Sequence, residues 1–210
     1  MVSITTRDRP HVLDYSLEKF REVYDGLIIV IDDNSETEEY NRLICKKYDA
    51  THLYNERRLG IPRSKERGFR ALLSFDHQFW FDDDCFPKPG WLERMLDATT
   101  RQGHLLHLKE WHHIQRKKVY KNSLVSYSGA TACFMSFRKD MYKDVHGFQA
   151  GFGLYGEWHH TLSQKMMKYG LDEYVAVERS SDYLHSFDVD GVPADFDYMF
   201  QSSLPPHERK

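Results

Sequence analysis

Residues 27–32 read Leu-Ile-Ile-Val-Ile-Asp, and this uninterrupted apolar run, followed by a second aspartate, decides the fold. A strand that is apolar at consecutive positions is buried on both faces, which is typical of parallel strands in α/β proteins. Amphipathic helical patterns and further short apolar runs alternate on both sides of it. We therefore expect residues 27–32 to form an inner strand of a parallel sheet.

The first half of the chain predicts a regular alternation of strands and helices. Strands are expected at residues 2–6, 27–32, 51–54 and 78–81, and helices at 11–24, at 36–48, from Pro62 and from Pro89. This order predicts an α/β fold with a central, mostly parallel sheet flanked by helices. Ligands of such sheets bind at the carboxyl ends of the strands, so polar residues at those ends are the candidate site.

The second half is less regular. Its pattern predicts strands at 104–109 and 131–138, helices at 139–146 and 157–169, and a loop rich in glycine and aromatic residues at 147–156. We find no internal repeat or linker. A single domain over residues 1–210 is therefore expected, with residues 191–210 as a loosely attached tail.

Composition excludes several classes of protein. The net charge of -3 gives no global attraction for nucleic acid or an anionic membrane, and the apolar share of 40% is that of a globular chain. Three scattered cysteines argue against a disulfide framework and favour a reducing, cytoplasmic location. No signal region and no apolar run of about 20 residues is found, so stable membrane insertion is not expected.

The strongest chemical signal is Asp82-Asp83-Asp84, directly after the strand expected at 78–81. Three adjacent carboxylates repel one another unless a cation or hydrogen-bond donors compensate them. Mg²⁺ and Mn²⁺ take carboxylate oxygens together with phosphate oxygens of a substrate. The alternative is a solvated acidic turn ahead of the next helix.

Two further patterns lie at neighbouring strand ends. Asp32-Asp33-Asn34-Ser35 follows the central strand, where a carboxylate could accept hydrogen bonds from a base or ribose, or the turn could simply cap the next helix. Gly60 allows a tight turn before a helix that carries Arg63, Lys65 and Arg67. Cations near a helix N-terminus suit a diphosphate, although the same pattern occurs on ordinary basic helix faces.

Together these motifs resemble the GT-A-fold, family 2 nucleotide-sugar glycosyltransferases. That family opens with Thr-x-x-Arg/Asn-x-Pro, which corresponds here to residues 5–10, and its second strand ends in Asp-Asp-Gly-Ser, which corresponds to 32–35. Its third motif, with two glycines eight residues apart, corresponds to Gly60 and Gly68, and its Asp-x-Asp metal motif corresponds to 82–84. The resemblance extends more weakly to about residue 187.

The resemblance implies roles for individual residues. Residues 1–100 would form the nucleotide-sugar-binding half and residues 101–190 the acceptor-binding half. A Mn²⁺ or Mg²⁺ ion would be held by Asp82 and Asp84, and a late histidine of some relatives corresponds to His185. The donor, most commonly a UDP-sugar in this family, would be contacted by Thr5, Arg7, Asp32, Asp33, Arg63, Lys65, Asp82 and Asp83.

The catalytic position departs from the family pattern. Where many relatives carry an aspartate, this chain has Glu157-Trp158-His159-His160. Trp158 lies on the apolar stripe of its helix, whereas Glu157 lies off it. Glu157 is therefore the expected base for an acceptor hydroxyl in an inverting displacement, His159 is the alternative base, and a plain helix cap is the bland interpretation.

The acceptor is left open between two classes. Trp111, Tyr155 and Trp158 are candidate acceptor contacts, because aromatic rings stack on a saccharide of a glycan. The basic stretch 109–121, with Arg57, Arg58, Arg63 and Arg70, could instead form a rim for a hydroxymethylated base in phage-type modified DNA, or be a solvated hairpin. The oligomeric state is not predicted.

Two rival functions remain at this stage. A metal-dependent nucleotidyltransferase would share the fold, the carboxylates and the cation, but it usually carries a glycine-rich loop where this chain has Arg7-Asp8-Arg9-Pro10. A non-catalytic module that binds nucleotide-sugars would explain the departure at position 158.

Overall fold

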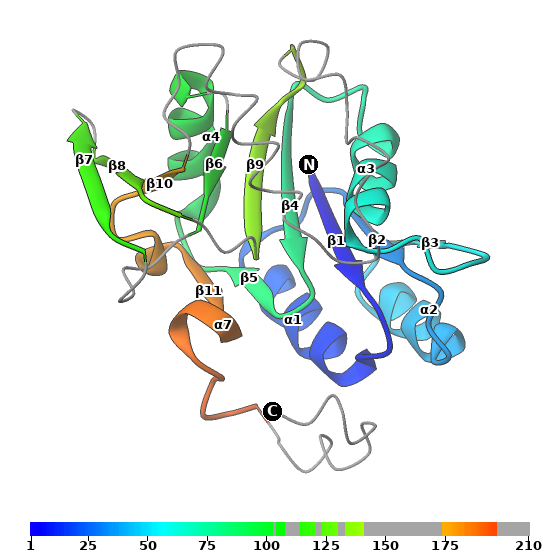
Figure 1. The fold of residues 1–210 in the computed structure, drawn as a ribbon. Coiled ribbons are helices and arrows are strands. Elements are labelled where there is room, and N and C mark those ends of the chain that lie inside the picture. Colours follow the sequence, from blue (N-terminus) through cyan, green and yellow to red (C-terminus); the bar gives the residue numbers. More distant parts are fainter. Residues whose placement is uncertain (103, 108–113, 121–122, 130–132, 141–173, 197–210) are drawn as a thin grey trace.

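The computed structural model describes residues 1–102, 104–107, 114–120, 123–129, 133–140 and 174–196 (Figure 1). The first half follows the predicted alternation. Its elements are β1 (Val2–Thr6), α1 (Pro10–Val23), β2 (Ile28–Asp32), α2 (Glu38–Lys47), β3 (Thr51–Tyr54), α3 (Ile61–Ala71) and β4 (His77–Asp82).

The remaining elements follow β4 in chain order. They are β5 (Cys85–Pro87), α4 (Trp91–Gln102), β6 (His104–Leu106), β7 (Arg116–Tyr120), β8 (Leu124–Tyr127), β9 (Phe134–Arg138), β10 (Val175–Val177), the 3₁₀ turn η2 (Ser180–Asp182), β11 (Leu184–Ser186) and α7 (Phe187–Asp190). Among the described helices, none has both the length and the apolar character needed to cross a membrane.

The main sheet places the strand ends of the first half along one edge. Its order is β3-β2-β1-β4-β9-β6-β10-β8-β7, and β1 pairs in parallel with both β2 and β4. The register sets Thr6 beside Asp32 and Thr5 beside Asp82. The chain winds outward from β1 to β3 and then returns to the other side of β1 with β4. This reversal is the position where α/β sheets bind ligands.

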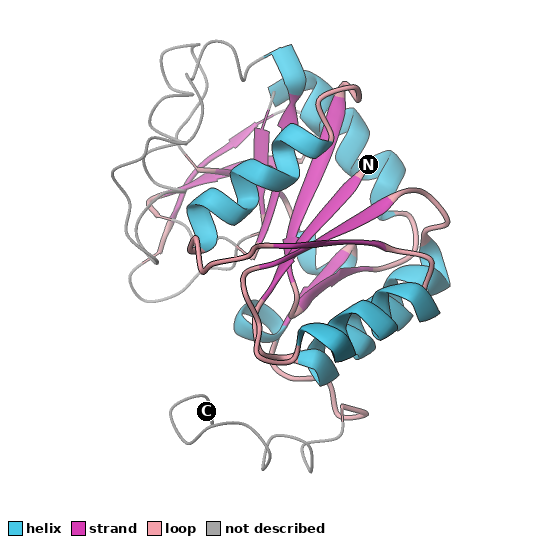
Figure 2. Cartoon of the chain, turned by 90° about the vertical axis from the view of Figure 1, so that its right-hand side faces the viewer, coloured by secondary structure: helices cyan, strands magenta, loops and turns pink. Residues whose placement is uncertain are grey.

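Helices cover both faces of this sheet (Figure 2). On one face, Ile4 and Phe81 belong to the main core cluster with Leu17 of α1 and Trp91 of α4. On the other face, α3 lies so close to β1 that a Cβ at Gly68 would stand 2.1 Å from Ser3 Oγ. Glycine at position 68 is therefore a packing requirement of the α3–β1 contact.

The second half returns to the same edge of the sheet. β9 is antiparallel to β4 and to β6, and β10 is parallel to β6. β6 and β10 therefore run in the direction of β4, and their carboxyl ends lie at the edge that carries the acidic residues. A separate ribbon of β5 and β11 brings the C-terminal segment to the same place, where Phe187 N donates to Asp84 O at 3.1 Å.

The expected fold class is confirmed, and several element boundaries were wrong. The helix expected from Pro89 begins at Trp91, because Gly90 has a positive φ of 79° and forms a turn with its neighbours. The strand expected at 104–109 ends at Leu106, and the one expected at 131–138 begins at Phe134 within the described residues. The strands β5, β7, β8, β10 and β11 were missed, and β5, β10 and β11 have only three residues each, too few to show a period.

Candidate active site

The acidic run follows β4 at the carboxyl edge of the sheet. Asp82 is the last residue of β4, and Asp83 and Asp84 form the turn that leads into β5. Asp83 has no exposed surface and Asp84 is 8% exposed. A run that repels itself in the sequence is thus folded into the protein, so its charge has to be compensated there.

Asp83 is held from the end of β1. Thr6 Oγ1 donates to Asp83 Oδ2 at 2.6 Å, and Arg9 Nε donates to the same oxygen at 3.2 Å while Arg9 Nη2 contacts Oδ1. Burial nevertheless raises the pKa of Asp83 to about 6, since it outweighs the opposing effect of Arg9 and is reinforced by the charge of Asp84.

Arg9 is the residue that the sequence reasoning missed. It precedes Pro10 at the start of α1, and its Nη1 lies 2.9 Å from Asp84 Oδ2, so one guanidinium joins two carboxylates. Burial alone would lower the pKa of Arg9, but the charges of Asp83 and Asp84 raise it above its usual value. The expected donor contact in this motif was Arg7, two residues earlier.

A second cation compensates Asp82. Lys65 Nζ lies 2.6 Å from Asp82 Oδ1 and donates to Phe81 O at 3.4 Å, and the Lys65 side chain is only 2% exposed. The Asp82 side chain is 30% exposed, so it lies at the surface of the cluster. Burial raises the pKa of Asp82, with Lys65 acting in the opposite direction.

The neighbouring carboxylate at the end of β2 is held by hydrogen-bond donors. Ser35 N donates to Asp32 Oδ1 at 2.9 Å, and Asn41 Nδ2 and His52 Nε2 lie 2.8 and 3.2 Å from Oδ2. Burial opposes ionisation of Asp32, but these hydrogen bonds outweigh it and hold its pKa below the usual value.

Asp33 organises the segment between β3 and α3. Its Oδ1 accepts from Asn55 Nδ2 at 3.0 Å, Leu59 N at 2.7 Å and Ser64 Oγ at 2.9 Å, and its Oδ2 accepts from Gly60 N at 2.8 Å. Gly60 has φ 82° and ψ 163°, a conformation essentially restricted to glycine. The glycine of the third motif is thus explained by the turn that Asp33 requires.

A pocket of about 500 Å³ lies beside this segment. It is lined by Tyr54, Asn55, Glu56, Arg57, Leu59 and Arg67. Arg67 Nη1 donates to Tyr54 O at 2.6 Å, which fixes one edge of its guanidinium in the pocket wall. An aromatic ring and two guanidinium groups therefore adjoin the carboxyl end of β3.

The remaining expected donor residues are near this edge but differ in exposure. Thr5 is 9% exposed beside Asp82 in the register. Arg7 Nη2 forms an ion pair with Asp8 at 3.1 Å, and its Nε is buried without a hydrogen-bond partner among the described residues. Arg63 is exposed on the first turn of α3.

Comparison with known proteins identifies the family. A family model described as glycosyl transferase family 2 matches residues 1–146, more than two thirds of the chain. The chain belongs to glycosyl transferase family 2. No curated protein matches it.

Solved structures share the GT-A fold of this chain. GalNAc-T7, solved with UDP, GalNAc and Mn²⁺, is 11% identical with a TM-score of 0.62, over 90% of this chain and 44% of that one. S. aureus TarS residues 1–349 in complex with UDP-GlcNAc is 13% identical with a TM-score of 0.59, over 79% and 52%. The chain therefore spans about half the length of these proteins or less.

Asp82 and Asp84 suit a divalent-cation site that is made of two carboxylates. Lys65 and Arg9 take one oxygen each of Asp82 and Asp84, and no described residue donates to the other oxygen of either side chain. Among the described residues, no three His, Cys, Asp or Glu side chains surround a common point. Mg²⁺ and Mn²⁺ are commonly held by one or two carboxylates with substrate phosphates supplying further ligands.

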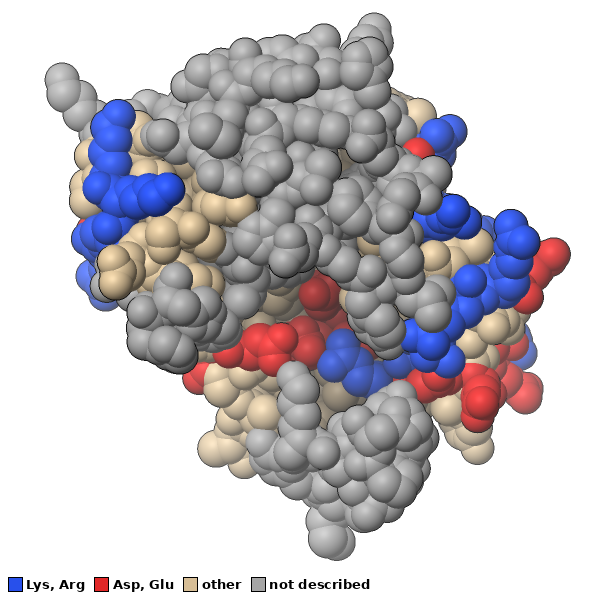
Figure 3. Space-filling view, in the orientation of Figure 1, with Lys and Arg blue, Asp and Glu red and all other residues tan. Residues whose placement is uncertain are grey.

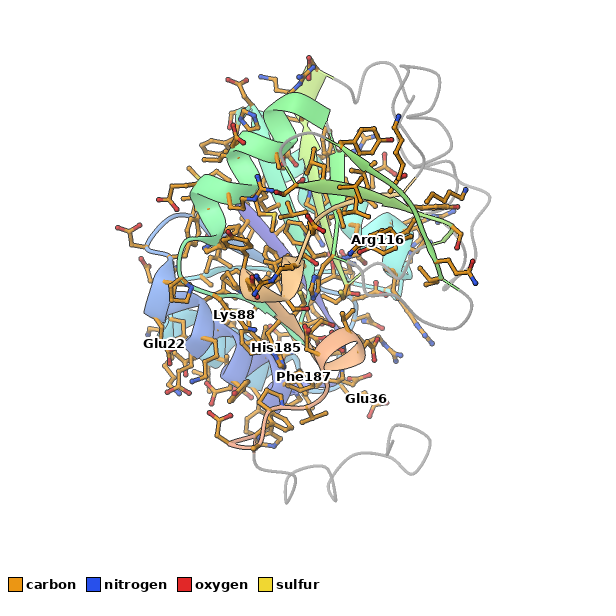
Figure 4. All side chains as sticks on the ribbon, turned by 90° about the vertical axis from the view of Figure 1, so that its left-hand side faces the viewer. Glu22, Glu36, Lys88, Arg116, His185 and Phe187 are labelled. Atoms are coloured by element: carbon orange, nitrogen blue, oxygen red, sulfur yellow. The ribbon has the colours of Figure 1, made fainter. Side chains whose placement is uncertain are left out.

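His185 lies across the β5–β11 ribbon from Phe86. Its ring stacks on Phe86 with 4.9 Å between centroids, and its Nε2 lies 2.9 Å from Gly191 O, so that nitrogen donates. Figure 4 shows His185 and Phe187 side by side at the C-terminal segment. Burial lowers the pKa of His185, which favours the neutral ring with Nδ1 as its acceptor atom.

The expected catalytic and acceptor residues lie outside the described residues. They are Glu157, His159, Trp111, Tyr155 and Trp158. Their assignments remain predictions.

The expected basic rim is divided between two places. β7 is the last strand of the main sheet, and its residues 116–119 are exposed, whereas Arg57 and Arg58 follow β3 at the opposite edge. Figure 3 shows basic surface at both sides of the molecule, with acidic and basic surface adjoining between them. Arg57 and Arg58 are eight strand pairings away from β7, so these two groups do not adjoin, and residues 109–113 and 121 of the basic stretch lie outside the described residues.

Proposed function

We propose that this chain transfers a sugar from a nucleotide-diphosphate donor, a UDP-sugar in the first instance, to an acceptor hydroxyl with the help of Mn²⁺ or Mg²⁺. The observation that carries the proposal is the gathering of Asp33 and the run 82–84 at one edge of the sheet. Thr6 connects them, since its carbonyl accepts from Asp33 N at 3.0 Å and its hydroxyl donates to Asp83. That edge is the ligand-binding position of an α/β sheet.

The donor is assigned to the first half of the chain. The base and ribose are placed beside Asp33, because Asp33 is 4% exposed and Asp32 is not exposed at all. Asp33 Oδ2 accepts one hydrogen bond and has capacity for another. The pocket beside Tyr54 supplies an aromatic ring and arginines on the same side, while Thr5, Arg7, Arg63 and Lys65 are the further candidate contacts.

The diphosphate is assigned to the end of β4. Asp82 and Asp84 are the residues that would hold the cation, with His185 as the further candidate. When bound, such a cation stabilises the charge that develops on the departing diphosphate. Lys65 and Arg9 hold the carboxylates in place, which fixes the geometry before the donor binds.

The reaction is a displacement at the anomeric carbon. The acceptor oxygen forms a bond to that carbon, the bond from the carbon to the diphosphate oxygen breaks, and the nucleoside diphosphate leaves. Glu157 takes the proton of the acceptor hydroxyl, and the result is inversion. His159 is the alternative base.

Replacement of the two candidate bases separates their roles. We expect Glu157→Gln to lower kcat by about 10²–10⁴-fold with donor binding retained, because the proton acceptor is lost. His159→Ala is expected to change kcat less than tenfold. Initial rates and UDP-sugar binding of the two variants give the measurement, and a larger loss in His159→Ala would reassign the base.

The acceptor is proposed to be a saccharide of a glycan, with a hydroxymethylated DNA base as the alternative outcome. The divided basic residues give less support to a nucleic acid than a continuous rim would. We also propose that the 210 residues form one domain that acts in the cytoplasm, since all three cysteines are free and buried. Fractionation of the producing cells tests this location.

The decisive experiment begins with thermal shifts on a panel of nucleotide-sugars, each with Mn²⁺ and with Mg²⁺. A ligand at a hundred times its Kd should stabilise the fold by about 2.7 kcal/mol. Product analysis then uses glycan acceptors and hydroxymethylated DNA with mass spectrometry. Release of a nucleoside diphosphate with a glycosylated acceptor supports the proposal, whereas pyrophosphate chemistry, or binding without turnover on every acceptor, would overturn it.

A further inference from the structure

Arg9 is a fixed cation inside the acidic run. It contacts Asp83 through Nε and Nη2 and Asp84 through Nη1, and its side chain remains 35% exposed. The adjoining backbone is pinned as well, because Asp8 N donates to Ser35 Oγ at 2.9 Å and Glu36 N donates to Asp8 Oδ1 at 2.6 Å. The guanidinium is thus held against the carboxylates while part of the side chain faces solvent.

The charges of the cluster do not favour a lone cation. Ionised Asp82, Asp83 and Asp84 exceed Arg9 and Lys65 by a single negative charge. A free divalent cation that approaches Asp84 meets one carboxylate oxygen already engaged and a guanidinium 2.9 Å from it. Like charges at such range oppose binding, even though the carboxylates attract the ion.

The opposite holds for a cation that arrives on a nucleoside diphosphate. The diphosphate carries more negative charge than the cation carries positive charge, so the complex is an anion overall. Its phosphate oxygens accept hydrogen bonds, and a guanidinium matches phosphate geometry. The same Arg9 that repels the free ion attracts the complex.

We propose that Arg9 is a specificity-determining residue that makes the acidic run accept a divalent cation together with a nucleoside diphosphate and discriminate against the free ion. This inference rests on the proposed function, because it concerns the same site. The inference assigns a role to Arg9, which is not one of the predicted contacts of the donor. If Arg9 had a purely structural role, its replacement would weaken the binding of both the free ion and the complex.

The test compares two dissociation constants in three variants. Free Mn²⁺ is followed by electron paramagnetic resonance in titrations of the full chain alone, and Mn²⁺–UDP is titrated calorimetrically. We expect Arg9→Gln to bind free Mn²⁺ about tenfold tighter and Mn²⁺–UDP about tenfold weaker than the unaltered chain. Arg9→Lys keeps the charge and should show much smaller changes in both constants. Arg42→Gln, on the exposed face of α2, is the matched control and should change neither.

A complementary variant keeps the test valid if Arg9→Gln does not fold. Asp83→Asn leaves Arg9 with less compensation, so it should bind free Mn²⁺ more weakly and Mn²⁺–UDP more tightly. Changes of both constants in the same direction, or no change in either, would overturn the inference. Failure of the proposed function has a different signature, namely that no nucleotide-sugar and no UDP binds the unaltered chain with or without the metal.

Discussion

Two acidic turns at neighbouring strand ends look alike in the sequence and are compensated differently in the structure. Asp33 accepts four hydrogen bonds, three from the segment between β3 and α3 and one from Ser64 in the first turn of α3. Asp84 is compensated by one edge of Arg9, and its other oxygen receives no hydrogen bond from the described residues. The first turn therefore uses most of its acceptor capacity to build a loop, and the second keeps a whole carboxylate oxygen for a ligand.

The difference shows that two pairs of carboxylates at strand ends can give unequal support for a binding site. Uncharged donors that fill most of the acceptor positions of an acid tie it to the fold, so its removal should lower stability. An acid compensated by a cation on one oxygen only can take a ligand on the other oxygen, so its removal should damage activity more than stability. This contrast is open to direct test.

The largest effect is expected for Asp84→Asn. Loss of this carboxylate should lower kcat/KM for sugar transfer by about 10²–10³-fold, or about 3–4 kcal/mol, because the departing diphosphate loses its cation. The melting temperature should fall little, since Arg9 retains Asp83. Metal-dependent rates and thermal melts of the variant give the measurement.

Asp25→Asn is the control for this prediction, because Asp25 is exposed in the turn after α1. Retention of metal-stimulated transfer by Asp84→Asn would show that the open oxygen of Asp84 has no part in holding the cation.

The next effect is expected for Asp33→Asn, and it should be on stability. An amide places an N–H group where Asp33 now only accepts, so at least one buried hydrogen bond is replaced by repulsion between donors. We expect a loss of about 3 kcal/mol in the free energy of unfolding, which corresponds to about 6–12 °C in melting temperature for a chain of this size. Denaturant unfolding with Asp25→Asn as reference measures it.

A loss below about 0.5 kcal/mol for Asp33→Asn, the range of ordinary surface substitutions, would erase the contrast. It would mean that the segment between β3 and α3 keeps its conformation without the four hydrogen bonds.

The fold of the first half could be predicted because each element is long enough to show its period. The apolar run before Asp32 and the stripe of α1 reappear as buried elements, with Leu13, Leu17 and Phe20 in the core. The same reasoning failed for β10 and β11, which are three residues long and exist through pairing with β6, β8 and β5. Such strands are made by tertiary contacts and leave no local pattern.

The site could be predicted to the level of strand ends but not of atoms. Asp82, Asp83 and Asp84 were placed at the correct edge by their position after an apolar strand. The role of Arg9 could not be derived, because the turn after β1 decides whether residue 7 or residue 9 reaches β4. Asp8 adopts φ 54° in that turn, and no periodicity in the sequence reports such a conformation.

The smallest effect is a pH dependence that separates the two turns by sign. Asp83 has a folded pKa of about 6, above its ordinary 3.8, so its contribution favours the fold at low pH and is lost as pH rises through about 6. Asp32 has a lowered pKa, so its contribution is present above 3.8 and is lost as pH falls below that value. Carboxyl ¹³C NMR titration, with Asp83→Asn and Asp32→Asn for assignment, should show Asp83 titrating above Asp32. The reverse order would mean that Arg9 compensates burial as fully as the hydrogen-bond donors do, and the two turns would then be electrostatically equivalent.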